Sequence, residues 1–103
     1  MIRANLLTSA GIDISEYAVV AGDGTSGSSS STISTPAQVD DLLIVSADGA
    51  TTSISGVTTE VLESCTGTAG SVIIYKVTSA GSVTYQPTGG GGHMTIFICR
   101  KSS

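Results

Sequence analysis

Few side chains in this sequence carry reactive chemistry: there is one histidine, and there are two cysteines and eight acidic residues. To act as a general base, His93 would need a nucleophile and an orienting acid within hydrogen-bond reach. Cys99 lies six residues further along the chain, which is about 20 Å in an extended strand at about 3.3 Å per residue. A Cys/His pair within that strand is therefore excluded, and His93 is interpreted as a residue of a loop or a strand entry.

The candidate metal ligands are four aspartates: Asp23, Asp48 and the pair Asp40-Asp41. Neither Asp-Gly step belongs to the calcium loop of an EF-hand, because the alternating oxygen ligands and the closing glutamate are missing. Asp-Gly is far more often a turn. We therefore predict no metal site, no cofactor and no catalytic residue.

Two other patterns suggest chemistry only by composition. Gly22-Asp23-Gly24 and the four glycines at 89–92 are followed by neither Lys-Ser/Thr nor a helical pattern, as a phosphate-binding loop would require. Glu60 and Glu63 form a candidate carboxylate pair, but in a regular strand they point to opposite faces. Both glutamates are interpreted as solvated.

The cysteines and tyrosines favour structural roles. Cys65 and Cys99 are too few for a small secreted disulfide scaffold, so we interpret them as small apolar core residues, with a disulfide as the alternative. Tyr17, Tyr75 and Tyr85 are candidates for a sugar-binding platform. Since the chain has no Trp, packing in the core or at a sheet edge is the preferred interpretation of all three.

The remaining composition favours β-structure. Ser, Thr and Gly supply 44 of 103 residues, and Ile and Val outnumber Leu, a bias typical of pleated sheet. Short strands separated by turn signals predict an all-β sandwich or barrel of seven or eight strands. The expected strands are 17–21, 42–45, 51–54, 57–64, 71–78, 83–86 and 94–100, with turns at 22–24, 47–50, 66–70 and 79–82 and a stop at Pro87.

Two of these strands carry a readable burial pattern. The continuous apolar run of residues 42–45 indicates a strand that is covered on both faces. In residues 94–100, Met94, Ile96, Ile98 and Arg100 share one face, and the residues between them share the other.

The chain divides into an N-terminal arm or edge strand, residues 1–16, and a sandwich domain, residues 17–103. The apolar stretch of the arm breaks at Thr8-Ser9 and is shorter than the apolar region of a typical signal peptide, so we expect a product made in the cytoplasm. The arm is a candidate for lying across a neighbouring subunit or adding a strand to its sheet edge. Its candidate interaction residues are Ile2, Leu6, Leu7, Ile12 and Ile14.

Charge excludes several partners. The chain has four basic and eight acidic residues, a formal net charge of −4, whereas phosphate contacts require a Lys/Arg surface. We therefore predict no nucleic-acid partner. The same balance disfavours an anionic membrane surface, and no apolar run approaches the roughly 18 residues of a spanning helix.

The order of features from Val39 to Lys101 resembles small β-sandwich modules of tailed-bacteriophage structural proteins. Residues 39–45 (VDDLLIV) resemble their Gly-Asp-Leu-Leu-Val strand entry, residues 75–78 (YKVT) their Tyr-Lys-Val-Ala strand, and residues 95–101 their closing strand. Residues 56–59 (GVTT) fall where those modules often carry Gly-Trp-Thr, with Val57 replacing the aromatic residue.

The resemblance implies a jelly-roll-like sandwich in the virion. A chain of one module fits a capsid decoration (cement) protein, a homo-oligomer (dimer or trimer) bound in many copies to the major capsid protein. The alternatives are a phage tail or fibre component, a receptor- or glycan-binding module, and a small non-viral sandwich such as an enzyme inhibitor or accessory subunit. An enzyme is the least favoured class.

Overall fold

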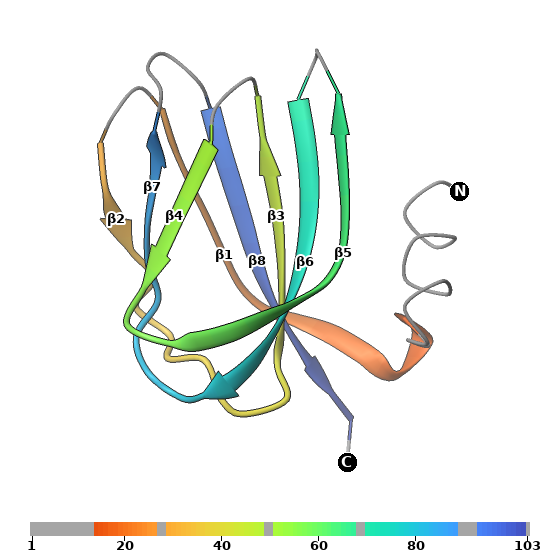
Figure 1. Ribbon diagram of the computed structural model, residues 1–103. Coiled ribbons are helices and arrows are strands. Elements are labelled where there is room, and N and C mark those ends of the chain that lie inside the picture. The colour runs from red at the N-terminus through yellow and green to blue at the C-terminus, as the bar shows by residue number, and fades with distance from the viewer. Residues whose placement is uncertain (1–13, 27–28, 49–50, 68–69, 89–92, 103) are drawn as a thin grey trace.

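Two antiparallel β-sheets packed face to face form the molecule (Figure 1). The computed structural model describes residues 14–26, 29–48, 51–67, 70–88 and 93–102. A five-stranded sheet has the order β1-β8-β3-β6-β5 and a three-stranded sheet the order β2-β7-β4. The elements are η1 (Ile14–Glu16), a single 3-10 turn, and β1 (Tyr17–Ser26), β2 (Ser31–Thr32), β3 (Leu42–Ala47), β4 (Thr51–Ser55), β5 (Thr58–Gly67), β6 (Gly70–Ser79), β7 (Thr84–Thr88) and β8 (His93–Lys101).

The strand order is that of a jelly roll in all but one pair. A jelly roll is a long hairpin rolled into two sheets, so the first strand pairs with the last and the remaining pairs are nested inside. Here β1 pairs with β8, β2 with β7 and β3 with β6, and every pair is antiparallel. Rolling brings β8 against β3 and β7 against β4. The predicted jelly-roll-like sandwich of seven or eight antiparallel strands is confirmed.

The pair that differs is the innermost one, β4 with β5. β5 instead pairs with β6 along its whole length and becomes the edge of the five-stranded sheet. In Figure 1, β5 leaves the end of β4 and crosses below the sandwich to the far sheet. Among the described residues, one edge of β4 and one edge of β5 therefore have no strand beside them.

The central strand β3 is buried on both faces, as its continuous apolar run predicts. Leu43 and Val45 point into the sandwich and join the main core. Leu42 and Ile44 point the opposite way, into a second apolar cluster on the outward face of the five-stranded sheet. This outward cluster consists of Leu42, Ile44, Ile74 and Cys99. The main core also holds Ile33, Ala37, Val77, Val83, Tyr85, Met94, Ile96 and Ile98. The predicted shared face of Met94, Ile96 and Ile98 is confirmed, and the structure shows that it is the inward one.

The predicted turn at Gly22-Asp23-Gly24 is wrong. These residues continue β1, which pairs with β8 as far as Ser26. Gly22 lies opposite Phe97, and a Cβ on Gly22 would come within 2.8 Å of that ring. The glycine therefore serves close cross-strand packing rather than a reversal of the chain.

Three further boundaries differ because strands find distant partners. Residues 51–54, expected to return beside 42–45, cross to the other sheet and pair with β7. Pro87 continues β7 instead of ending it, opposite Thr52. Since β2 reaches only Thr84 and Tyr85, Pro87 lies at a free edge on that side, where a missing amide is tolerated. The expected loop 66–70 belongs partly to the ends of β5 and β6.

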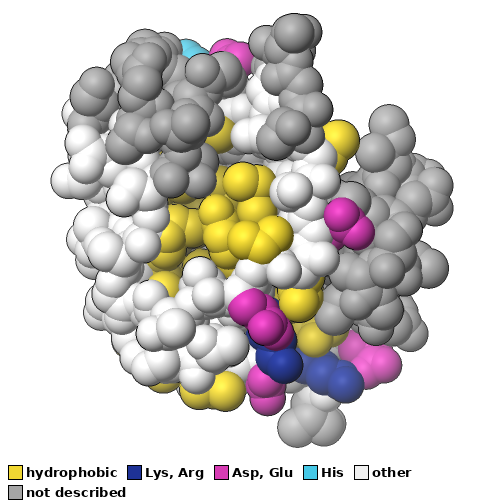
Figure 2. Space-filling view, viewed as in Figure 1, with side chains coloured by type: hydrophobic (Ala, Val, Ile, Leu, Met, Phe, Trp, Pro, Cys, Tyr) yellow, Lys and Arg dark blue, Asp and Glu magenta, His cyan; other side chains and the backbone are white. Residues whose placement is uncertain are grey.

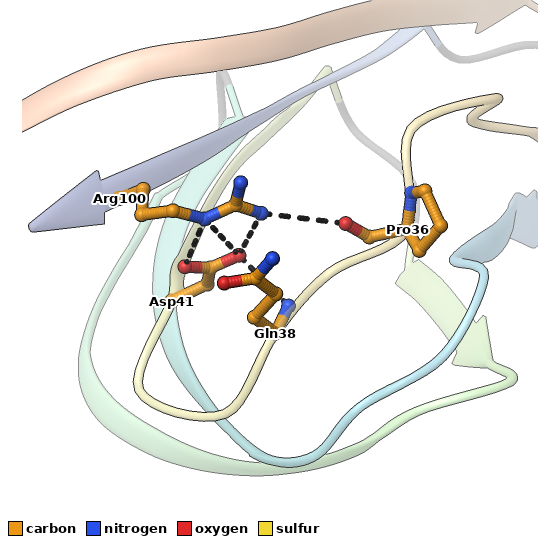
Figure 3. A network of polar contacts seen from close by, with 4 residues as sticks. All are labelled: Pro36, Gln38, Asp41 and Arg100. Carbon is orange, nitrogen blue, oxygen red and sulfur yellow. Dashed lines mark hydrogen bonds and ion pairs between the residues drawn. The ribbon is translucent and has the colours of Figure 1, made fainter.

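An ion pair between Arg100 and the buried carboxylate of Asp41 fixes the loop that leads into β3 (Figure 3). Arg100 Nε donates to Asp41 Oδ1 at 3.0 Å, and Arg100 Nη2 donates to Asp41 Oδ2 at 2.8 Å. The backbone N–H of Gln38 donates to the same Oδ2 at 2.9 Å. Arg100 Nη2 also donates to the Pro36 carbonyl oxygen. The side chain of Asp41 is only 3% exposed, and the hydrogen-bonded carboxylate raises the pKa of Arg100.

Backbone hydrogen bonds connect the same loop to β6. The Asp40 amide donates to the Val77 carbonyl oxygen, and the Val77 amide donates to the Asp41 carbonyl oxygen, both at 2.9 Å. Asp40 has a φ of 74°, in the left-handed region that Asp and Asn tolerate better than most residues.

Within the described ranges, no helix has the length and apolar character to span a bilayer.

The two neighbouring aspartates allow a matched test of the ion pair between Asp41 and Arg100. We expect Asp41→Asn to lower the free energy of unfolding by about 2 kcal/mol, because a buried charge-assisted fork is lost. Asp40→Asn removes only the exposed bridge to Lys76 and should change stability by about 0.5 kcal/mol or less. Urea denaturation of both variants measures the difference, and equal losses would contradict the proposed role of Asp41.

Candidate interaction site

The histidine and the cysteines lie apart, so no Cys/His pair forms. His93 is exposed at the start of β8, opposite Ser26. Both cysteines are free thiols: Cys65 is exposed, whereas Cys99 is buried in the outward cluster. The core interpretation is therefore confirmed for Cys99 and wrong for Cys65. Burial, with a smaller contribution from the Asp41 charge, raises the pKa of the Cys99 thiol.

Three of the four candidate aspartates take separate structural roles. Asp41 binds Arg100, Asp40 forms an ion pair with Lys76 at 3.4 Å, and Asp23 accepts a 2.9 Å hydrogen bond from the Ser31 hydroxyl. No cluster of three or more His, Cys, Asp or Glu side chains suited to a metal ion occurs in the described ranges.

The glutamate pair is not arranged as a regular strand would arrange it. A β-bulge between Val61 and Glu63 shifts the register, so that Glu60 lies opposite Lys76 and Glu63 opposite Ile74. Residues 76 and 74 share a face of β6. The two glutamates therefore face the same side, and the expectation of opposite faces is wrong because the bulge inserts one residue.

The three tyrosines do not gather into a platform. Tyr85 is fully buried in the main core, Tyr75 packs against that core from its margin, and Tyr17 packs against the outward cluster. Their interpretation as packing residues is confirmed.

The hydroxyl of Tyr85 is an unusual member of the core. It is buried near Asp23 and Ser31, which hydrogen-bond to each other, and it makes no hydrogen bond of ordinary geometry. Burial first, and then the neighbouring Asp23 carboxylate, raise the pKa of Tyr85 to about 12. The hydrogen bond from Ser31 lowers the pKa of Asp23.

Tyr85 yields a prediction about alkaline stability. The unfolded chain releases this phenolic proton near pH 10 and the folded chain only near pH 12, so the unfolded state binds fewer protons between these values and stability falls as pH rises. We expect Tyr85→Phe to lose this part of the alkaline fall, while changing stability at pH 7 by about 1 kcal/mol or less. Urea denaturation across pH 8–12 tests this, with Tyr17→Phe as the control; an unchanged alkaline slope in Tyr85→Phe would contradict it.

One accessible apolar feature is the open side of the sandwich, between β4 and the β5–β6 pair. Figure 2 looks into this opening and shows hydrophobic side chains on its floor. Ile54 of β4 and Tyr75 of β6 pack against the main core but are only partly buried. Val61 of β5 lies opposite Tyr75 and is 58% exposed. We refer to Ile54, Val61 and Tyr75 as the open-side residues.

The corner that joins β4 to β5 determines where this opening lies. Gly56 has a φ of 87°, and a Cβ there would lie 2.0 Å from the Ser82 carbonyl oxygen. A Cβ on Gly81 would in turn lie 2.2 Å from the Gly56 carbonyl oxygen. Because neither glycine carries a Cβ, the corner at Gly56 lies in close contact with residues 81–82, just before β7. From this corner β5 runs toward the other sheet.

The open side combines two unsatisfied needs of a β-sandwich. A free strand edge presents unpaired amide and carbonyl groups, and the apolar floor is exposed to water. The described residues of β4 carry no charge. An extended peptide with alternating apolar side chains meets both needs, because its backbone pairs with β4 while its side chains cover the floor.

A second concavity lies beside β1. Residues 20–23 and 32–35 line an open hollow of about 360 Å³. Its wall is largely backbone and hydroxyl groups, and Asp23 is its charged member. None of the three tyrosines lines it, so it lacks the aromatic face on which sugars usually stack.

The arm residues named from the sequence are not placed by this structure. Ile2, Leu6, Leu7 and Ile12 lie outside the described residues, and Ile14 is described only as part of the 3-10 turn η1. Among the open-side residues, the sequence drew attention only to Tyr75, as one of three candidate platform tyrosines. Ile54 and Val61 were not identified, because their exposure depends on which strand β5 pairs with. Comparison of the chain with family models, curated proteins and solved structures finds no match in any of the three.

Proposed function

We propose that the chain is a non-enzymatic virion structural protein: a capsid decoration protein that binds the major capsid protein in many copies. The observation that carries the proposal is the open side of the sandwich, where the β4 edge and the apolar open-side residues are exposed together. The resemblance of residues 39–101 to small phage β-sandwich modules supplies the biological setting. The protein is made in the host cytoplasm and acts on the particle.

The open side suits a partner that donates a strand. Main-chain hydrogen bonds to β4 give affinity, and alternate side chains of the partner enter the opening beside Val61 and Tyr75. The five residues of β4 match the length of an average strand. In this proposal an extended segment of the major capsid protein takes the position that β5 vacates in the jelly roll.

The surface composition supports close packing among many copies. Ion pairs engage Lys76, Arg100 and Lys101. Figure 2 shows the charged side chains on this face gathered mainly at one end of the molecule. A surface of hydroxyl and apolar groups needs little charge desolvation on association, which suits neighbouring copies, as dimers or trimers, on a crowded shell.

The hollow beside β1 is the observation that favours the second candidate function, a tail component or receptor- or glycan-binding module. Its hydroxyl groups and Asp23 fit a small polar ligand. Light scattering of the purified protein, with and without capsid shells from the same source, separates the two functions. Binding in hundreds of copies supports decoration, whereas a stable trimer that ignores shells supports the second function.

Val61 provides the sharper test of the proposed site. Val61→Lys places a charge in the opening, and because Val61 is 58% exposed, stability should change by about 0.5 kcal/mol or less. We expect occupancy on capsid shells to fall about tenfold or more, because an apolar strand can no longer enter without burying the lysine. Cosedimentation with shells and gel densitometry measure the occupancy.

The control is Val39→Lys, the same change at a position of nearly equal exposure (54%) in the turn before β3. This variant should keep wild-type occupancy. Equal occupancy of both variants would contradict a role of the open side, while failure of the wild-type protein to bind shells would reject decoration itself.

A further inference from the structure

β1 is an edge of the five-stranded sheet, and among the described residues no strand lies on its outer side. The strand has ten residues, Tyr17–Ser26, and its ladder partner is β8. A free edge presents backbone amide and carbonyl groups to which another strand can bind. The hollow lined by residues 20–23 and 32–35 opens beside the middle of β1, so solvent reaches this part of the edge.

Two of the other three sheet edges carry features that hinder pairing with an identical strand. β2 has only two residues. β5 has two register shifts and carries Glu60 and Glu63, which would meet the acidic side chains of a second copy. Short length, irregular pairing and charge are usual means of protecting an edge. The third edge, β4, is the one that the proposed function assigns to the capsid protein.

β1 lacks most of this protection. Residues 17–22 (YAVVAG) contain neither a charge nor a proline, and the pairing with β8 is irregular at one point, between Val19 and Ala21. The exposed side chains at this point are apolar, since Val19 is 61% exposed and Val20 39%. A long apolar edge of this kind is a surface to which another strand adds.

The sequence of β1 is complementary to itself about a twofold axis between Val19 and Val20. Two antiparallel copies related by this axis form three kinds of facing pair: Tyr17 with Gly22, Ala18 with Ala21, and Val19 with Val20. A bulky residue then faces one without a side chain, and the other pairs match in size. Facing pairs of this kind are the unit that stabilises a sheet.

The irregularity in β1 makes this register possible. Residues that face each other across two strands lie on the same side of the sheet, whereas positions 18 and 21 of a regular strand lie on opposite sides. In β1, Ala18 lies opposite Arg100 and Ala21 opposite Ile98, two positions on one face of β8. The extra residue therefore places Ala18 and Ala21 on one side of the sheet, where they can meet in a dimer.

Charge favours this neutral segment for contact between two copies. Each copy has a net charge of −4, so two copies repel each other and a contact between uncharged residues costs least. The nearest carboxylates, Glu16 and Asp23, flank the segment and already have partners. Glu16 forms an ion pair with Lys101 at 3.2 Å, and Asp23 accepts a hydrogen bond from Ser31.

We propose that β1 is the contact surface for a second copy of this chain. Two β1 strands pair antiparallel about the twofold axis at Val19 and Val20 and join two five-stranded sheets into one continuous sheet. The β1 contact is independent of the proposed function, because β1 and β5 are opposite edges of their sheet and the dimer leaves both open sides free.

Sedimentation velocity of the full chain from about 1 μM to about 1 mM tests the proposal. A reductant keeps the exposed thiol of Cys65 from forming disulfides. We expect a monomer–dimer equilibrium that shifts toward dimer as NaCl is raised, because salt screens the repulsion between two acidic copies. A monomer over the whole range, or a trimer, would overturn the proposal.

Val19→Lys tests the position of the contact. We expect the dimer to weaken about tenfold or more, because the two lysines would lie together at the twofold axis and a charge on an edge strand hinders pairing. Val39→Lys makes the same change of charge at 54% exposure in the turn before β3 and should dimerise like the wild-type protein. Circular dichroism checks that both variants fold, and equal dimerisation of the two would contradict a contact at β1.

Disulfide trapping tests the register. Directly opposite residues have Cα atoms about 4.5–5.5 Å apart, which a disulfide can span, whereas position 18 of one copy lies three residues, or about 10 Å, from position 18 of the other. In a Cys65→Ser background, Ala18→Cys/Ala21→Cys should oxidise to a covalent dimer on a non-reducing gel, and neither single variant should. No covalent dimer of the double variant, or equal cross-linking of a single variant, would overturn the proposed pairing.

The outcomes separate the β1 contact from the proposed function. Protein that dimerises but ignores capsid shells keeps the β1 contact and rejects decoration, whereas protein that binds shells but stays monomeric in solution does the reverse. Val61→Lys, which alters the open side, should leave the dimer intact. Loss of the dimer in this variant would place the contact on the open side and overturn the proposal.

Discussion

The structure depends on the double burial of β3. Its six residues pair with β8 on one side and β6 on the other, and its side chains alternate between two apolar layers. A strand of this kind requires cover on both faces, since neither row of side chains is compatible with water. The three-stranded sheet covers the inward row, and Tyr17, Leu62 and Val72 pack against the outward row.

The ion pair of Asp41 and Arg100 serves the same constraint. It holds the loop that brings the chain into β3 and ties it to the end of β8, while the backbone bonds of residues 40 and 41 attach it to β6. A short apolar strand has little to fix its register against two neighbours. A buried charged fork at its entry gives the strand one position, because any slip would leave a charge without its partner.

The parts of the fold set by local pattern were predictable from the sequence. The run Leu42-Leu43-Ile44-Val45 indicated burial on both faces, and the alternation of residues 94–100 grouped Met94, Ile96 and Ile98 correctly on one face of β8. Predictions were wrong where a distant partner decides the outcome. Gly22 stays in a strand because Phe97 covers it, and the bulge in β5 brings Glu60 and Glu63 to one face.

The candidate site could not be predicted from the local sequence pattern for the same reason. The composition of residues 58–67 suits a strand on either sheet, and only the pairing of β5 with β6 exposes Val61 and the edge of β4. The glycine corner at Gly56 is visible in the sequence as a single glycine, but its contact with residue 82 is not. Which sheet β5 joins is decided only in the assembled fold. That choice determines whether the sandwich is closed or exposes an interaction surface.

The ion pairs of the described lysines and arginines have a kinetic consequence. With the net charge of the chain at −4 and Lys76, Arg100 and Lys101 each held by a carboxylate, the described surface offers no cluster of free cations to attract an acidic partner over a distance. Association with an uncharged partner segment should then proceed at the unsteered rates of about 10⁵–10⁶ M⁻¹s⁻¹ and depend little on ionic strength. Tight attachment would have to come from slow dissociation, so the lifetime of the bound state would determine how long the protein stays in place.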